Sequence, residues 1–180
     1  MAEAYERGLA RADSNPMCFV VHIAGILDEY LEETAKSENL AVSDECLLEA
    51  GVTGTRRLYN IMKERGYRAL LLGGGSRSPR HFTGLVGGNL AITISYSHAR
   101  DLVESRPPLE AAIDVKPSAA MLEELESSFL DFKRAYYEDA LRPEEFAGFD
   151  PCGKFQRMCE EGYRATLNEI AGRRKQILCE

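Results

Sequence analysis

A short apolar run followed by a glycine-rich turn constrains the fold of this chain more than any other feature of its sequence. Residues 68–72 have the length and composition of a buried strand, and the turn at residues 73–77 follows directly. Ser78 and Pro79 then provide a helix start, because proline is favoured in the first helical turn. The order of strand, loop and helix N-terminus is typical of a βα unit.

The chain repeats this arrangement immediately afterwards. Residues 90–94 predict a second strand, and Ser97 can cap a helix over residues 98–104. Consecutive βα units imply neighbouring parallel strands that are joined by right-handed crossovers. The sequence therefore predicts an α/β fold.

The segment before these units predicts several further elements. A helix, a strand and a second helix are expected at residues 2–12, 17–23 and 26–34. A loop or extension over residues 36–50 should follow. Thr53 or Thr55 would then cap another helix, with Gly66 as its left-handed terminator.

The C-terminal third has the periodicity of helices. Apolar residues recur every three or four positions over residues 122–136. The stripe formed by Phe129, Phe132 and Tyr136 is expected in a core or an interface and not around a cofactor. A last helix is expected from Asp150 through Ile170, with Arg173, Arg174 and Lys175 near its C-terminus.

Composition limits the partners that the chain can have. Its 180 residues are 44% hydrophobic and 28% charged, which suits one globular domain. The net charge of -7 repels polyanions, so neither nucleic acid nor an anionic membrane is an expected partner. The sequence has neither an apolar run of roughly 20 residues nor the apolar start of a secretory signal, so a cytoplasmic location is expected.

The cysteines do not predict a metal site. None of the five lies in a CxxC or CxxH pattern: Cys18, Cys46, Cys152, Cys159 and Cys179. We expect reduced thiols, no bound metal and no cofactor.

The glycine-rich turn carries the most informative chemistry. Three consecutive glycines let backbone amides approach a ligand, and the guanidinium of Arg77 offers a fork of donors that suits phosphate. We therefore expect an anion against Gly74, Gly75, Ser76 and Arg77. The turn matches neither a P-loop nor the GxGxxG pattern, so a nucleotide is the weaker expectation. The alternative is a tight turn with a solvated Arg77.

Five ordered segments of the chain resemble bacterial transaldolases. They are FVVHIAGILDEY at 19–30, GVTGTRRLYNIMKERGY at 51–67, LLLGGGSRS at 70–78, LAITIS at 90–95, and the helical tail at 121–175. The family fold is a (β/α)₈ barrel, so the resemblance implies a partial TIM-type (β/α) barrel with about three parallel strands. Residues 1–105 would form the last third of the barrel, and residues 106–180 a helical C-terminal extension packing on the same domain.

The resemblance also implies roles for single residues. Arg77 matches the arginine that holds the substrate phosphate in the family's strand-seven loop, and Ser95 matches a position at the mouth of the eighth strand. On the first matching strand the family has a serine, an aromatic residue and a second phosphate-binding arginine. This chain has Val20, His22 and Gly25 there. His22, near the strand's C-terminal end, could replace a lost donor.

The family's chemistry depends on a lysine that has no counterpart in this chain. In the family a lysine forms a Schiff base with a keto-sugar phosphate, and a three-carbon unit then passes to an aldose phosphate. The lysine belongs to a strand that precedes the region matched by this chain. Most lysines of this chain are expected on helices or loops: Lys36, Lys63, Lys133, Lys154 and Lys175. Lys116 is expected in an exposed loop beside Asp114; the alternative is an extended stretch at residues 111–117 that would bring the two side chains together.

The three histidines have both functional and structural interpretations. His22 is either a ligand contact or proton shuttle, or a partly buried, hydrogen-bonded side chain. His81 and His98 fall on predicted helix starts, where surface positions are expected.

Three hypotheses follow, from different classes of protein. The first is part of a transaldolase-like enzyme, catalytic only when the missing barrel half is supplied. The second is a non-catalytic sugar-phosphate-binding module, and the third is an oligomerisation fragment in which the glycine-rich loop is only a turn. The expected ligand is a sugar phosphate or a phosphate ion. Three strands cannot close a barrel, so the expected protein partner is either further copies of this chain or an N-terminal barrel half. A reading frame extending upstream of Met1 would favour the first hypothesis over the second.

Overall fold

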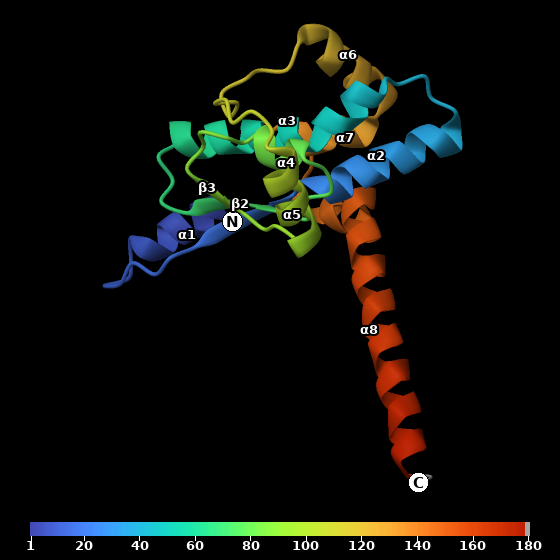
Figure 1. Ribbon diagram of the computed structural model, residues 1–180. Coiled ribbons are helices and arrows are strands. Elements are labelled where there is room, and N and C mark those ends of the chain that lie inside the picture. The colour runs from blue at the N-terminus through green and yellow to red at the C-terminus, as the bar shows by residue number, and fades with distance from the viewer. Residues whose placement is uncertain (179–180) are drawn as a thin grey trace. The chain divides into compact units, whose positions relative to one another are not determined.

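The computed structural model describes residues 1–178 and divides the chain into two compact units, Met1–Ala140 and a second unit that begins at Leu141. The first unit contains, in chain order, α1 (Ala2–Leu9), β1 (Phe19–Ile23), α2 (Ala24–Glu38), α3 (Asp44–Glu64), β2 (Leu70–Gly74), α4 (Arg80–Thr83), β3 (Leu90–Ile92), α5 (Tyr96–Ser105), α6 (Ala119–Ser128) and α7 (Leu130–Tyr136) (Figure 1). The second unit contains the 3₁₀-helix η1 (Pro143–Gly148) and α8 (Asp150–Leu178).

The three strands form one parallel sheet in the order β1-β2-β3. In its register His22 lies opposite Gly73, and Gly73 lies opposite Ile92. Because the strands are parallel, the segments that follow them leave the sheet at the same edge. The parallel sheet confirms the predicted α/β class and gathers the ends of β1 and β2 at one place.

The helices α2 and α3 together form the connection between β1 and β2 and pack against each other. Their contact is close at Gly51 of α3, where an added Cβ would lie 2.6 Å from the carbonyl oxygen of Ala24. Helices α6 and α7 pack on the same pair and contribute Leu125 and Phe132, both fully buried. Phe129 is also buried in this cluster, which confirms the core interpretation of the aromatic stripe.

The two faces of the sheet have different surroundings. Val20 and Leu71 point to the side of α3, where they pack with Met62. Strand side chains alternate between faces, so Phe19 and Val21 point to the opposite side. Their exposed fractions are 38% and 50%, respectively. On this face, two apolar side chains of β1 are thus open to solvent.

The predicted loop over residues 36–50 is wrong. Helix α2 continues to Glu38, and α3 already begins at Asp44. Ser43 caps α3 by accepting a hydrogen bond from the backbone N–H of Cys46, so Thr53 and Thr55 are helix-interior residues and not caps. Serine followed by acidic residues is a regular helix start, and it outweighs the polar composition that suggested a loop.

Other boundaries also differ from the prediction. Ser95, and not Ser97, caps α5 with its hydroxyl accepting from the N–H of His98. The helix expected over residues 122–136 is divided at Phe129, whose extended backbone separates α6 from α7. Gly66 does follow α3 with a positive φ of 63°, as predicted for its left-handed terminator.

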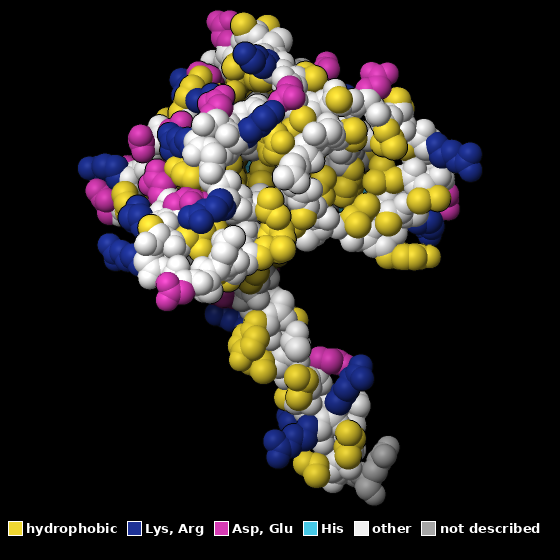
Figure 2. All heavy atoms as spheres, turned by 90° about the vertical axis from the view of Figure 1, so that its left-hand side faces the viewer, with side chains coloured by type: hydrophobic (Ala, Val, Ile, Leu, Met, Phe, Trp, Pro, Cys, Tyr) yellow, Lys and Arg dark blue, Asp and Glu magenta, His cyan; other side chains and the backbone are white. Residues whose placement is uncertain are grey.

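Figure 2 shows hydrophobic side chains at the surface along α8. Tyr163, Leu167 and Ile170 are exposed there, at spacings of four and three residues, so they share one side of the helix. The helix of the second unit therefore presents an apolar row. No helix among residues 1–178 is long and apolar enough to cross a membrane.

Candidate functional site

His22 lies at the C-terminal end of β1, beside the glycine-rich end of β2. Its Nδ1 is 2.8 Å from the hydroxyl oxygen of Thr55, and that hydroxyl is also 2.8 Å from the carbonyl oxygen of Gly51. Thr55 has one hydroxyl proton, which it donates to Gly51, so it accepts from the Nδ1–H of His22. The other ring nitrogen, Nε2, then carries a lone pair and no proton.

Burial disfavours the charged form of His22. Desolvation, reinforced by the nearby His81, lowers the pKa of His22 from 6.5 to about 4. At neutral pH the ring is therefore uncharged, and its Nε2 is a hydrogen-bond acceptor. His22 is thus half-buried and hydrogen-bonded, as the structural alternative for this residue required. Its partner, Thr55 of α3, lies 33 residues further along the chain.

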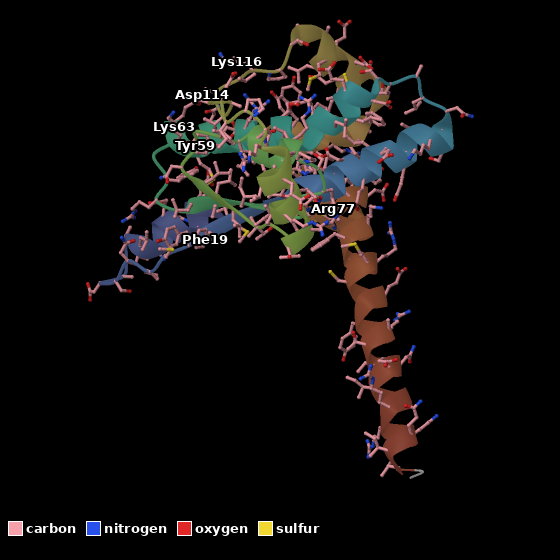
Figure 3. All side chains as sticks on the ribbon, viewed as in Figure 1. Phe19, Tyr59, Lys63, Arg77, Asp114 and Lys116 are labelled. Atoms are coloured by element: carbon pink, nitrogen blue, oxygen red, sulfur yellow. The ribbon has the colours of Figure 1, made fainter. Side chains whose placement is uncertain are left out.

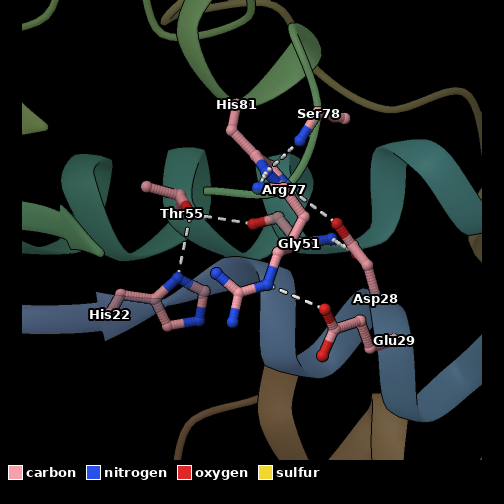
Figure 4. Close-up of polar contacts among 8 residues, drawn as sticks. All are labelled: His22, Asp28, Glu29, Gly51, Thr55, Arg77, Ser78 and His81. Carbon is pink, nitrogen blue, oxygen red and sulfur yellow. Dashed lines mark hydrogen bonds and ion pairs between the residues drawn. The ribbon is translucent and has the colours of Figure 1, made fainter. Parts of the chain in front are cut away.

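A second cluster joins α2, α3 and α4 around Asp28 (Figure 4). One carboxylate oxygen of Asp28 accepts from the backbone N–H of Gly51 at 2.6 Å, and the other is 2.6 Å from Nε2 of His81. Burial raises the pKa of Asp28, and the hydrogen bond from His81 opposes this rise. The carboxylate thus ties the start of α2 to α3 and to α4.

His81 connects this cluster to the glycine-rich turn. Its Nδ1 accepts from the backbone N–H of Arg77 at 2.9 Å and of Ser78 at 3.3 Å, so Nε2 carries the proton that faces Asp28. The surface position predicted for His81 is wrong, because this side chain is only 2% exposed. Its two partners are a backbone turn and a distant carboxylate, which the residue pattern around position 81 does not reveal.

The turn itself lies against the start of α2. A Cβ added to Gly25 would be 2.0 Å from the carbonyl oxygen of Gly75 and 2.5 Å from Cγ of Arg77. Gly75 has a positive φ of 63°, which favours glycine. The space above Gly25 is therefore filled by the turn, and no side chain, including a second arginine, fits there in this arrangement.

Arg77 extends from this turn toward the end of β1. Its Nε donates to a carboxylate oxygen of Glu29 at 2.7 Å, and 42% of its side chain is exposed. Within residues 1–178, no hydrogen bond or ion pair involves its two Nη atoms. Arg77 can therefore offer two donor nitrogens to an anion while Glu29 holds the guanidinium in place.

The helix after the turn is shorter than expected. Helix α4 has four residues, and the backbone N–H groups of Arg77 and Ser78 already donate to His81. A single turn adds little dipole, so any anion here would depend on Arg77 rather than on a helix N-terminus. Ser78 contributes a further polar atom, a buried hydroxyl that has no partner in the described chain.

Ser95 is placed at the same edge of the sheet, after β3. Its hydroxyl caps α5 and also lies 2.9 Å from Nδ1 of His98 and 3.0 Å from the hydroxyl of Ser97. His98 is half-buried and makes a tilted ring contact with Phe82. The hydroxyl of Ser95 is thus engaged within its own helix start.

None of the six lysines of the chain lies on a strand of the described region. Lys36, Lys63, Lys133, Lys154 and Lys175 are on helices, as predicted. Residues 111–117 contain no strand and Lys116 is exposed, which agrees with the loop interpretation of this stretch, but Asp114 pairs with Lys63 at 3.8 Å. An ion pair with Glu32 raises the pKa of Lys36, the direction opposite to the one an imine former requires.

Taken together, the site is a basic loop at the carboxyl edge of a parallel sheet, braced by a buried aspartate–histidine pair. Open α/β sheets bind ligands at this edge, and the phosphate sites of barrels gather at the last strands. The sequence singled out Arg77 and His22, and both lie at this edge. It did not identify Asp28, Glu29 or Thr55, for which it offered no motif.

Two curated proteins are similar to this chain, and both are named transaldolase. The protein from Cellvibrio japonicus (strain Ueda107) is 25% identical over 143 residues, which cover 79% of this chain and 43% of that protein. The protein from Pseudoalteromonas atlantica (strain T6c / ATCC BAA-1087) is 29% identical over 110 residues, or 61% of this chain and 33% of that protein. These matches support a distant relationship to transaldolases.

The chain spans less than half the length of these curated relatives. No family model matches the sequence, and no solved structure matches it.

Proposed function

We propose that this chain is a transaldolase-like protein of sugar-phosphate metabolism that supplies a phosphate-binding edge. The distant relationship to transaldolases supports the substrate class. The observation that carries the proposal is the placement of Arg77, with two free Nη donors, on a turn braced by Gly25 and His81. A guanidinium held in this way is preorganised to receive a phosphate group.

The phosphate would bind to the Nη groups of Arg77, next to Gly74, Gly75 and Ser76. Charge-assisted hydrogen bonds of this kind contribute roughly 1.5 to 3 kcal/mol each. Glu29 occupies Nε and carries the same charge sign as the ligand, so the affinity should be modest. Nε2 of His22 would accept a hydrogen bond from a sugar hydroxyl, and Ser95 would border the same edge.

We further propose that the sheet is part of a (β/α) barrel that other strands complete. The exposed Phe19 and Val21 support this, because an apolar sheet face needs a cover. The cover would be the remaining strands of a longer chain or further copies of this one. In that assembly the Schiff-base lysine, which transfers a three-carbon unit in transaldolases, would come from the completing part.

A phosphate-dependent rise in thermal stability tests the proposal. Wild-type protein should be stabilised by inorganic phosphate and by fructose 6-phosphate, by about 2.7 kcal/mol when the ligand is at a hundred times its Kd. The Arg77→Ala variant should show no such rise, because it lacks the Nη donors.

Arg100→Ala is the matched control, because it removes an exposed arginine from α5 and leaves the turn unchanged. It should respond to phosphate as wild type does. A wild type without any response, or an Arg77→Ala variant that keeps the full response, would make the turn purely structural.

A non-catalytic assembly module is the second candidate. The exposed apolar row of Tyr163, Leu167 and Ile170 on α8 favours it, since such a row gains free energy when it is covered. Phosphate binding at Arg77 separates the two candidates, because an assembly module needs no ligand there.

A further inference from the structure

Helix α8 is the longest helix of the described chain and has little packing of its own. Of its 29 residues, Pro151 alone is buried. Figure 3 shows side chains projecting from both sides of the helix along its length. Most helical stability in proteins comes from packing of an apolar face, because isolated helices are marginal in water. We therefore expect another surface to cover α8.

The apolar residues of α8 show what kind of surface that is. Tyr163, Ile170 and Ile177 follow one another at intervals of seven residues, which is close to two full turns of the helix. Leu167 lies between the first two, on the same side. The exposed fractions of these four side chains run from 46% for Leu167 to 73% for Ile177. A seven-residue repeat is typical of a helix that packs lengthwise along another helix.

The charges beside this apolar row differ between the two halves of the helix. Glu160 lies seven residues before Leu167, and Arg174 lies seven residues after it. The three residues therefore form one line along the helix. Arg173 and Lys175, on either side of Arg174, make that end basic. Leu167 is thus the midpoint between an acidic position and a basic one.

A second copy of α8 complements this pattern when it runs in the opposite direction. A two-fold axis at Leu167 would place Arg174 of the second copy beside Glu160 of the first, and symmetry would make the same pair again. Leu167 would then meet Leu167 of the second copy, within two apolar rows that cover each other. A parallel copy would instead bring Glu160 to Glu160 and Arg174 to Arg174, and like charges repel.

We propose that two copies of this chain associate through α8 as an antiparallel helix pair. Burial of the apolar row supplies the free energy, and the two pairs of Glu160 with Arg174 set the direction. The charged groups stay at the rim of the contact, where they determine orientation more than affinity. This pairing gives the assembly candidate a defined partner, and it does not depend on phosphate binding at Arg77.

Charge exchange in the full chain, followed by sedimentation equilibrium at low ionic strength, tests the proposal. Wild type should form a dimer. Glu160→Arg and Arg174→Glu should each weaken the dimer at least roughly fivefold, because each replaces two attractions with two repulsions. The chain that carries both substitutions should regain an affinity close to that of wild type, since opposite charges face each other again. Parallel pairing predicts no such recovery.

Glu161→Arg is the matched control, because it makes the same charge change one residue further along. Glu161 lies two residues before Tyr163 and so on the opposite side of the helix from the apolar row. This variant should dimerise like wild type. Arg77→Ala should do so too, so a failed phosphate response would leave this result unaffected.

Three outcomes would overturn the proposal. The first is a wild-type chain that sediments as a monomer throughout the concentration range. The second is a double exchange that dimerises no better than either single variant. The third is a Glu161→Arg variant whose dimer is weakened as much as that of Glu160→Arg.

Discussion

Two histidines near the candidate site are held in different tautomers. His22 donates from Nδ1 to Thr55, whereas His81 donates from Nε2 to Asp28 and accepts at Nδ1 from the turn. The backbone and hydroxyl partners decide the tautomer in each case. As a result His22 presents an acceptor at the sheet edge, while both nitrogens of His81 are used to hold the fold together.

The burial of His22 predicts a pH-dependent stability. Its pKa is about 4 in the folded chain and 6.5 ordinarily, so the unfolded chain takes up the proton first as the pH falls. Its contribution to stability is complete above pH 6.5 and is lost as the pH falls toward 4. The slope should be at most about 1.4 kcal/mol per pH unit. Denaturant unfolding of wild type and His22→Phe across this range measures the difference.

The variant His98→Asn keeps His22 and should retain the wild-type slope. Parallel stability curves for wild type and His22→Phe between pH 4 and 6.5 would contradict the assigned protonation of His22.

The sequence identified the residues that carry recognisable chemistry but not their partners. Arg77 stood out in the sequence because it follows three consecutive glycines. Glu29 lies 48 residues away from Arg77, and Asp28 lies 53 residues away from His81. In sequence, an acidic residue of a helix looks the same whether it faces solvent or a partner. The pairs are therefore visible only in the folded chain.

At the scale of elements, the close approach between α2 and the glycine-rich turn is the most demanding contact. The approach brings Gly25 against the backbone of Gly75, which cannot move aside as a flexible side chain would. The geometry of the site therefore requires a residue without a side chain at position 25.

The Gly25→Ala substitution should disrupt this contact. The new methyl group would lie 2.0 Å from the carbonyl oxygen of Gly75, so either α2 or the turn must shift. We expect a loss of about 1 to 3 kcal/mol in the free energy of unfolding, together with a weaker phosphate response. Chemical denaturation with and without phosphate measures both effects.

Gly8→Ala is the matched control, since Gly8 lies inside α1 and a Cβ there would have nothing within 4 Å. That substitution should be neutral or stabilising by roughly 0.5 to 1 kcal/mol. Equal stabilities for the two variants would show that the turn does not pack on Gly25.

At the scale of the whole molecule, the described chain lacks a lysine suited to Schiff-base chemistry. An imine former must be unprotonated near neutral pH, which requires desolvation or a neighbouring cation. Five lysines lie on helices, and Lys116 is on an exposed segment. A site built from these residues has no amine that could activate the carbonyl of a substrate.

This polypeptide alone should therefore form no covalent adduct with a keto-sugar phosphate. Incubation with fructose 6-phosphate and borohydride, followed by intact-mass measurement, should return the unmodified mass. A three- or six-carbon adduct would show that a lysine of this chain is activated after all. Lys116→Gln would then be the first variant to test, with Lys133→Gln as its control.

The sequence by itself determined the α/β class, the parallel arrangement and the position of the basic turn, because these depend on local periodicity, glycines and a proline. Only the tertiary structure decided which face of the sheet is open and that His81 is buried against Asp28. These features depend on contacts between residues that are far apart in the chain. Such contacts are set by distance and burial in the folded protein, and a local sequence pattern does not record them.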